Sequence, residues 1–314
     1  MREKLSFNER ARGAILGAMI GDALGSRYSF MKAEQIRNLQ EQRAWNLFRI
    51  SDDTQAMVAL MEALASHGAD FDVVSRAYMR WANSEPEDID VVSCSAFMGK
   101  KARSTSELWA RNGQDFGRLC SNQLISRQIP WSIVAAHWDT ITLRHCIDLD
   151  TRLSHDGAVC SEEAQIYAVA LSSILRGQDK ATIWKQIFAH SRSKSSYHAL
   201  LDSYFKAPRC DGSNYSDILV PLQVSLYYFW HCDNFVATLR NVVSRGGACD
   251  TNAAATGALL GAFYGTEVIP MAWLQALSQN PDNTKGNYSV QRAMQLCNKL
   301  LSERIEADIE LLAA

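Results

Sequence analysis

The sequence predicts an all-α protein that folds as a single compact domain over residues 1–314. Proline is scarce, with 6 in 314 residues, and few runs alternate apolar with polar residues, so helices are favoured over a β-sandwich. Apolar residues make up 47% of the chain and charged residues 21%, which supplies a large core and excludes a disordered chain. No βαβ rhythm, internal repeat or linker divides the sequence, so we expect one domain.

Apolar residues recur at helical spacing in several segments, and each segment is expected to form a helix that buries one face. These segments are residues 9–25, 54–66, 71–81, 162–175, 217–230, 235–243, 270–277 and 288–312. No apolar run reaches the ~18–20 residues that a membrane-spanning helix needs, so no membrane partner is expected.

The predicted helix over residues 9–25 and a further segment, residues 256–265 (TGALLGAFYG), carry glycine at every fourth position, which in a helix places the glycines along one face. A glycine inside a helix costs about 1 kcal/mol relative to alanine, and close approach of another backbone is the usual compensation. We therefore predict that the two helices cross in the core with their glycine faces in contact; the alternative is two unrelated helices rich in small residues. The residues are Gly13, Gly17, Gly21 and Gly25 in the first helix and Gly257, Gly261 and Gly265 in the second.

An acidic pair opens a strongly apolar helix at Ser51-Asp52-Asp53-Thr54. The simpler interpretation is structural: a serine N-cap is followed by acidic residues that interact favourably with the positive end of the helix dipole. The functional interpretation is a site for a hard cation. Carboxylates and hydroxyls offer only oxygen ligands, which suit Mg²⁺, Mn²⁺ or Ca²⁺ and not zinc.

A second acidic cap, Asp250-Thr251, opens the second glycine-rich helix. It follows Gly246 and Gly247, which allow the loop to turn tightly and to approach a ligand closely. Helix capping is again the simpler alternative. Two similar clusters, each at the start of a helix, are stronger evidence than one, because several oxygens would converge on one point if the helices are neighbours.

These motifs, in this order, resemble the ADP-ribosylglycohydrolases. That family includes hydrolases that remove ADP-ribose from modified arginine or serine, and the nitrogenase-reductase reactivating enzyme. The resemblance runs from about residue 12 to residue 277 and rests on short segments. They are residues 13–25 (GAILGAMIGDALG), 51–55 (SDDTQ), 86–89 (PEDI), 121–130 (SNQLISRQIP), 153–155 (LSH) and 246–265, which begin GGACDTN.

The resemblance implies an all-α fold with a metal-lined cleft that holds one or two Mg²⁺ or Mn²⁺ ions. The ligands that it implies for the metal are Ser51, Asp52, Asp53, Asp250 and Thr251; the catalytic residues are Asp52, Asp53 and Asp250; and the residues that contact the substrate are Asn122, His155, Gly246 and Gly247. For Arg127, it leaves a structural role in holding its own loop as an equal alternative to ligand contact.

The resemblance also implies a reaction. In the family the metal ions hold the ribose hydroxyls and polarise the glycosidic bond, and water attacks the anomeric carbon through an oxocarbenium-like transition state. The expected activity is therefore metal-dependent release of ADP-ribose from an ADP-ribosylated protein, with the N-glycosidic bond to arginine as the expected linkage.

Two departures from the family pattern bear on this activity. Ser29 stands where the family usually has a glutamate, and Ala248 where it has an aspartate. Smaller changes are Ser51 in place of threonine, Gln123 in place of glycine and Ser126 in place of methionine. Because metal affinity depends on ligand number and charge, we expect one metal position, formed by Ser51, Asp52, Asp53 and Asp250, to survive and the other to be weakened or empty. The alternative function is a catalytically weakened relative that binds ADP-ribose, or an antitoxin or immunity protein that neutralises a cognate ADP-ribosyltransferase.

Charge and cysteine content indicate which partners and which cellular compartment to expect. The chain has 32 basic and 34 acidic residues and a net charge of -2, which does not suggest a nucleic-acid partner. The first residues lack the apolar stretch of a signal peptide. The eight cysteines show no C-x-x-C pair and no metal spacing. We therefore expect reduced, mostly buried thiols in a cytoplasmic protein.

Overall fold

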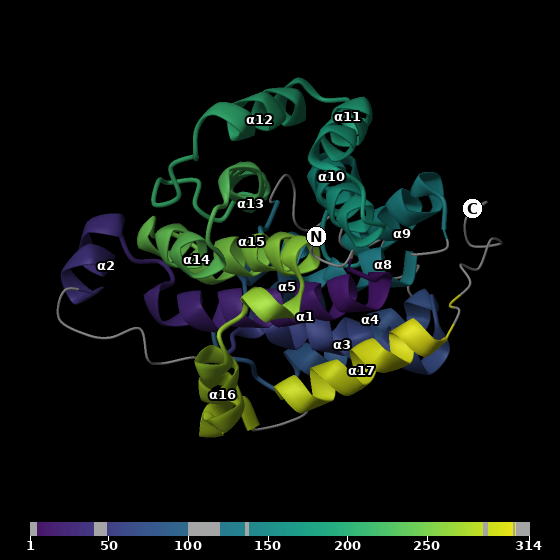
Figure 1. Ribbon diagram of the computed structural model, residues 1–314. Helices are drawn as coiled ribbons and strands as arrows, with labels where there is room; N and C mark the ends of the chain where they lie inside the picture. Colours follow the sequence, from purple (N-terminus) through teal and green to yellow (C-terminus); the bar gives the residue numbers. More distant parts are fainter. Residues whose placement is uncertain are drawn as a thin grey trace.

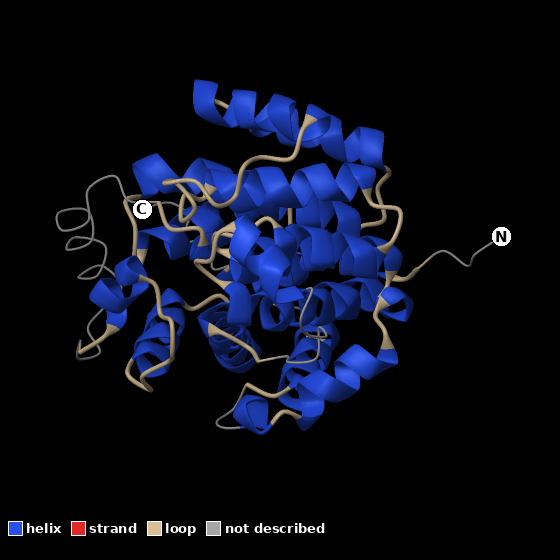
Figure 2. Cartoon of the chain, turned by 90° about the vertical axis from the view of Figure 1, so that its left-hand side faces the viewer, coloured by secondary structure: helices blue, strands red, loops and turns tan. Residues whose placement is uncertain are grey.

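The structure, a computed structural model, describes residues 5–40, 49–99, 120–135, 138–284, 288–303 and 305. Within this part of the chain all regular structure is helical, and Figure 2 shows helices joined by loops without a strand. The closest approach to a sheet is two isolated bridges, between Lys32 and Gly246 and between Ser121 and Asp217. The predicted all-α class is therefore confirmed, while the single-domain boundary stays a prediction.

Every segment predicted to be helical contains a helix. The α-helices are α1 (Phe7–Gly25), α2 (Ala33–Gln40), α3 (Asp52–His67), α4 (Phe71–Ala82), α5 (Val91–Phe97), α7 (Gln123–Arg127), α8 (Ile129–Val134), α9 (Thr140–Arg152), α10 (Gly157–Leu175), α11 (Lys180–His190), α12 (Lys194–Phe205), α13 (Leu219–His231), α14 (Phe235–Ser244), α15 (Cys249–Tyr264), α16 (Met271–Gln279) and α17 (Val290–Ser302). Short 3₁₀ helices are η1 (Ser26–Tyr28), η3 (Thr266–Val268) and η4 (Pro281–Thr284). The end of the last predicted segment, residues 306–312, lies outside the described residues.

The helices α1 and α15 run side by side through the middle of the molecule (Figure 1). In that view α13 lies on one side of this pair, α3, α4 and α17 lie on the other, and α14 lies beside the end of α15. Nearly all of α1 and α15 is buried, as expected for two helices that other helices cover. No helix in the described part of the chain is long and apolar enough to cross a membrane.

The glycine faces of α1 and α15 are in contact, which confirms the predicted crossing. A Cβ atom added to Gly17 would lie 2.0 Å from the carbonyl oxygen of Gly257, so the two backbones touch without side chains between them. At the end of α1, a Cβ atom on Gly25 would lie 2.5 Å from the backbone nitrogen of Asp250. Because only glycine permits this approach, the glycines set the distance between the end of α1 and the start of α15.

Arg127 has a structural role. Its guanidinium, with a fully buried side chain, pairs with the buried carboxylate of Asp150 at 3.1 Å and lies over the ring of Tyr78 at 4.8 Å. The Tyr78 hydroxyl and the indole N–H of Trp131 each donate to the same carboxylate at 2.9 Å. This network ties α7 to α9 and so fixes the residues at the start of α7.

Replacing Arg127 by methionine is expected to lower the free energy of unfolding by about 3–5 kcal/mol, because Asp150 would keep a buried charge without its partner. Arg152→Met is the matched control. Its half-exposed side chain pairs with Asp148 at 2.8 Å on the surface of α9, and the loss should stay below about 1 kcal/mol. Urea denaturation of both variants measures the change in the free energy of unfolding. Equal changes would show that the buried ion pair stabilises the protein no more than the surface pair does.

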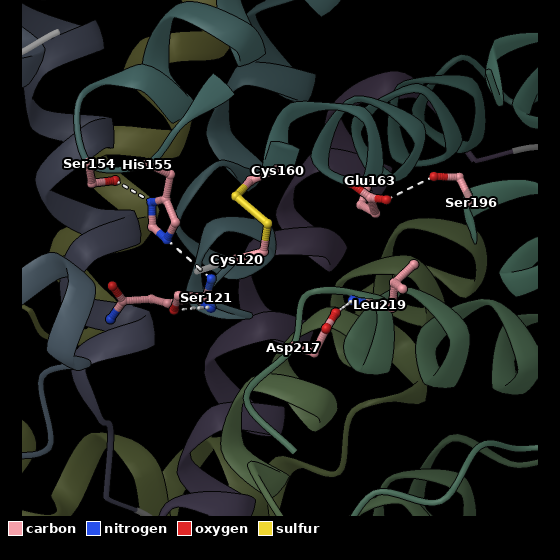
Figure 3. The surroundings of a disulfide bond; sticks show 10 residues. Cys120, Ser121, Ser154, His155, Cys160, Glu163, Ser196, Asp217 and Leu219 are labelled. Carbon is pink, nitrogen blue, oxygen red and sulfur yellow. Dashed lines mark hydrogen bonds between the residues drawn. A yellow bond between two sulfur atoms is a disulfide. The ribbon is translucent and has the colours of Figure 1, made fainter. Parts of the chain in front are cut away.

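Two of the eight cysteines are bonded, which corrects the expectation that all are reduced thiols. Cys120, just before α7, forms a disulfide with Cys160 in α10 (Figure 3). The two residues are 40 positions apart and belong to no recognised spacing, so only the packing of α10 behind the start of α7 brings them together. The free cysteines are Cys94, Cys146, Cys210, Cys232, Cys249 and Cys297, all buried except the half-buried Cys94.

Candidate active site

The N-termini of α3 and α15 meet beside the end of α1. Asp53, in the first turn of α3, accepts a hydrogen bond from the Thr251 hydroxyl at 2.8 Å, and its other oxygen accepts one from the Ser126 hydroxyl of α7. Carboxylate oxygens of Asp22, Asp53 and Asp250 lie within 4.8 Å of one another, and all three side chains are buried. The acidic first turns of α3 and α15 therefore converge on one oxygen-rich cluster, although the N-cap residues themselves are Ser51 and Ala248.

Asp22 is a member of this cluster that sequence reasoning missed. Its carboxylate accepts hydrogen bonds from the Ser51 hydroxyl at 2.5 Å, from the Ser51 amide at 3.0 Å and from the Thr54 amide at 3.1 Å. Ser51 in turn caps α3, since its hydroxyl oxygen accepts from the amide of Asp53 at 3.3 Å. The available signal was a single charged residue inside the apolar, glycine-rich run of residues 13–25.

Asp52 is not one of the three clustered carboxylates, and it lines the neighbouring cavity. One of its oxygens accepts hydrogen bonds from the side-chain amide of Gln123 and from the backbone amide of Asp90, the latter at 3.3 Å. The Ser93 hydroxyl donates to the Gln123 carbonyl oxygen at 2.5 Å, which fixes the orientation of the amide group. Gln123, a departure from the family pattern, therefore holds Asp52 in place.

The cluster carries negative charge without a basic partner. Burial, and then the charges of neighbouring aspartates, raise the pKa of both Asp52 and Asp53 well above the ordinary value. Burial raises the pKa of Asp22 to about 6, against the opposing effect of hydrogen bonds from Ser51 and Thr54. No salt bridge in the described part of the chain reaches these aspartates. Buried charges without compensation are unfavourable, so the donor set fits a divalent cation.

A cavity of about 540 Å³ lies beside the cluster. Asp52, Asp250, Thr251 and Asn122 contribute polar groups to its lining. The other lining residues are Phe30, Asp88, Ile89, Asp90, Val91, Val92, Cys120, Ser121, Gln123, Tyr215, Ser216 and Ala248. Apolar and aromatic walls with a few converging polar groups are typical of small-ligand sites, so this cavity is the candidate cleft.

His155 lies behind the wall of the cleft and not in its lining. Its Nε2 atom accepts a hydrogen bond from the backbone amide of Ser121 at 3.2 Å, and its Nδ1 atom lies 2.7 Å from the Ser154 hydroxyl (Figure 3). Burial, and then the charge of Arg127, lower the pKa of His155 well below its ordinary value, so the ring is neutral. The structure thus shows His155 supporting the segment that carries Asn122; contact with a substrate stays a prediction.

Gly246 and Gly247 also lie outside the lining of the cavity. Both have positive φ angles, +73° and +72°, and both contact backbone: an added Cβ atom would lie 2.5 Å from the carbonyl oxygen of Met31 or 1.9 Å from that of Cys210. The amide of Gly247 donates to the Met31 carbonyl at 2.9 Å. In the described structure these glycines join the start of α15 to the segment after α1, and a role in ligand contact stays a prediction.

A family model described as ADP-ribosylglycohydrolase matches residues 3–309. The chain belongs to this family. Among its relatives, the ADP-ribosyl-[dinitrogen reductase] glycohydrolase of Rhodospirillum rubrum is 26% identical over 288 residues, which cover 87% of this chain and 91% of that protein. ADP-ribosylarginine hydrolase Tri1 of Pseudomonas putida (strain GB-1) is 23% identical over 289 residues, covering 86% and 74%. A solved structure of an ADP-ribosylglycohydrolase-related protein complex has a TM-score of 0.74 at 21% identity and covers 95% of this chain and 99% of that one, which shows the shared fold.

The family assignment confirms the resemblance, and with it the expectation of a glycosidic-bond hydrolase at the level of the family. Of the two departures of this ADP-ribosylglycohydrolase, Ala248 lines the cavity, whereas Ser29 lies outside the lining and beside Asp250. Ala248 lines the cavity with a methyl group instead of a carboxylate. Burial raises the pKa of Asp250. The nearby Ser29 offers a neutral hydroxyl that has no hydrogen-bond partner among the residues that the structure describes.

Proposed function

We propose that this ADP-ribosylglycohydrolase releases ADP-ribose from arginine side chains of a modified protein, in a reaction that requires a divalent cation. The observation that carries the proposal is the cluster of Asp22, Asp53 and Asp250 beside a cavity of about 540 Å³. The cluster has the charge that a dication needs, and the cavity has the size of a small-ligand site. The arginine linkage is supported by the relatives named ADP-ribosylarginine hydrolase.

The residues expected to hold Mg²⁺ or Mn²⁺ are Asp53, Asp250 and Thr251, with Ser51 and Asp22 supporting the same oxygen-rich cluster. Asp52, which the family resemblance also implies as a ligand, is not one of the three clustered carboxylates, and its role as a ligand stays a prediction. A bound cation supplies positive charge that orients the ribose hydroxyls and polarises the glycosidic bond. The chain itself keeps the carboxylates close together by crossing α1 and α15 through their glycines.

Asp52 is the residue to which we assign proton transfer. It lines the cavity, and its raised pKa allows it to hold a proton closer to neutral pH than an exposed aspartate would. The reaction breaks the bond between the anomeric carbon and the arginine nitrogen, and water supplies the new oxygen. Asp52 would accept the proton from water or deliver one to the leaving nitrogen, while Gln123 and the amide of Asp90 keep its carboxylate oriented.

One cation per chain is the expected stoichiometry. Ser29 and Ala248 lack the carboxylates of the family pattern, and the amide of Gln123 already occupies an oxygen of Asp52. Calorimetric titration with Mn²⁺ should therefore saturate at a single ion, and Asp250→Asn should remove the binding signal. Saturation at two ions would contradict this part of the proposal.

The test of the reaction is release of free ADP-ribose from a peptide ADP-ribosylated on arginine. Release is expected in Mg²⁺ or Mn²⁺ and should stop when EDTA removes the metal, with chromatography and mass spectrometry as the measurement. A peptide modified on serine, matched in sequence, tests the linkage and is expected to react more slowly. If neither peptide loses ADP-ribose in either metal, the proposed hydrolase activity is wrong.

A second candidate function follows from Ser29 and Ala248, which leave the cleft short of two carboxylates. A weakened relative would bind ADP-ribose without turnover and could neutralise a cognate ADP-ribosyltransferase as an antitoxin or immunity protein. Calorimetry with free ADP-ribose separates the candidates, because binding without release of ADP-ribose from either peptide would favour the second. For both functions we expect a cytoplasmic location.

A further inference from the structure

The disulfide between Cys120 and Cys160 joins the wall of the cleft to the helix behind it (Figure 3). Cys120 is half-buried and lines the cavity, whereas Cys160 is fully buried in α10. Their Cα atoms are 5.2 Å apart, within the usual range for a disulfide. Cys120 is therefore the end of this bond that lies nearer to solvent and to the cavity.

The same short segment is also held by backbone hydrogen bonds. The carbonyl oxygen of Cys120 accepts from the amide of Ile218 at 3.2 Å, and the amide of Asn122 donates to the carbonyl oxygen of Ser216 at 3.0 Å. Hydrogen bonds of this kind open and close on their own, but a covalent bond does not. The disulfide is therefore the contact whose loss would most increase the mobility of residues 120–123.

Residues 121–123 connect this bond to the chemistry of the cleft. Asn122 lines the cavity, and the side-chain amide of Gln123 holds the carboxylate of Asp52. Gln123 is only three positions from Cys120, so movement of the segment alters the position of the group that orients Asp52.

We propose that Cys120 and Cys160 form a reversible thiol–disulfide modification site that controls the order of the cleft wall. In the oxidised state the wall is fixed to α10, and ADP-ribose enters a prearranged cleft. In the reduced state residues 120–123 must be ordered when the ligand binds, which weakens binding. The effect on ADP-ribose rests on the proposed function, whereas the effect on the wall does not.

The exchange chemistry needs only small thiols and disulfides, such as reduced and oxidised glutathione. An external thiolate attacks the sulfur of Cys120, forms a mixed disulfide and displaces the Cys160 thiolate, which takes a proton from water. A second external thiolate then attacks the external sulfur of the mixed disulfide and frees Cys120, which is protonated in turn. Two electrons and two protons have then entered the protein, and the external thiols leave as their disulfide; closure is the reverse reaction.

The test compares protein equilibrated with oxidised or reduced glutathione. Alkylation after denaturation, counted by mass spectrometry, should modify six cysteines in the oxidised protein and all eight in the reduced protein. Hydrogen–deuterium exchange should be faster in residues 120–127 of the reduced protein. Calorimetry should give ADP-ribose binding about fivefold weaker in the reduced protein, as expected when a few residues must be ordered on binding.

Two variants distinguish the effect of losing the disulfide from a general effect of replacing a cysteine. Cys160→Ser removes the disulfide without changing a residue of the cleft lining, and in reduced glutathione it should behave like reduced wild-type protein. Cys94→Ser, which removes a half-buried free thiol, should still respond to oxidation as wild type does.

The outcomes are distinct. Eight modified cysteines after treatment with oxidised glutathione, or equal hydrogen exchange in the two states, would overturn the proposal. Equal affinity for ADP-ribose in the two states would also overturn it. If ADP-ribose binds in neither state, the proposed function is wrong, and hydrogen exchange alone decides whether the disulfide orders the wall.

Discussion

Asp53→Asn is expected to abolish divalent-cation binding and nearly all hydrolysis while leaving the protein folded. The asparagine side chain keeps an oxygen that can accept from the Thr251 or Ser126 hydroxyl, but it removes the negative charge from the cluster. Loss of a group that stabilises charge at the reacting centre typically lowers turnover by about 10²–10³-fold, and we expect a fall in kcat of at least this size. Release of ADP-ribose measures the activity, and calorimetry with Mn²⁺ measures the binding.

The melting temperature distinguishes a loss of cation binding and activity in Asp53→Asn from misfolding of the variant. Burial raises the pKa of Asp53, so its ionised form is unfavourable in the metal-free protein. Removing that charge should leave the metal-free melting temperature unchanged or higher, and Mg²⁺ should no longer raise it. Asp202→Asn, which changes an exposed carboxylate on α12, is the control and should retain full activity. Wild-type turnover in Asp53→Asn would exclude this residue from the metal site.

Gly17→Ala is expected to have the largest effect on stability. The added methyl group would lie 2.0 Å from the carbonyl oxygen of Gly257, which belongs to the backbone of α15 and cannot rotate away. The two helices must move apart, and the helices that pack on both sides of the pair must shift with them. We expect a loss of more than about 4 kcal/mol in the free energy of unfolding, at the upper end of single substitutions. Urea denaturation, or the fraction of soluble protein, measures it.

Gly212→Ala is the matched control for this prediction. Its added methyl group would meet chiefly the end of the Asn214 side chain, at 3.0 Å, and that side chain can move. The change in the free energy of unfolding should stay within about 0.5 kcal/mol, as for most surface substitutions. If Gly17→Ala were equally mild, the contact between α1 and α15 would be looser than the structure shows.

The central helices and their acidic starts could be predicted because their signals are local. Glycine at every fourth position marks a helix face that approaches another backbone, as Gly17 and Gly257 do. Likewise, a serine or an acidic residue before an apolar run marks a helix start, which Asp52 and Asp250 bear out. The step from two separate caps to one cluster needed only the additional prediction that the two helices cross.

The remaining parts of the site depend on contacts between distant residues. Asp22 lies inside a buried helix, and its role follows from its contact with Ser51, which no local pattern reveals. Gln123 stood out only as a departure from the family pattern, because its bond to Asp52 requires α7 to pack against α3. The prediction of reduced thiols was wrong for Cys120 and Cys160 for the same reason, since their pairing depends on α10 lying behind α7.

The direct contact of α1 with α15 has a consequence for how this cleft can evolve. The distance between Asp22 and Asp250 is set by main chain against main chain, and not by side chains that can be exchanged for slightly larger or smaller ones. In a cation site of the proposed kind, repacking of side chains would therefore leave the separation of these carboxylates unchanged. A change in cation preference would require replacement of a ligand, and Ser29 and Ala248 stand at the positions where the family resemblance implies carboxylates.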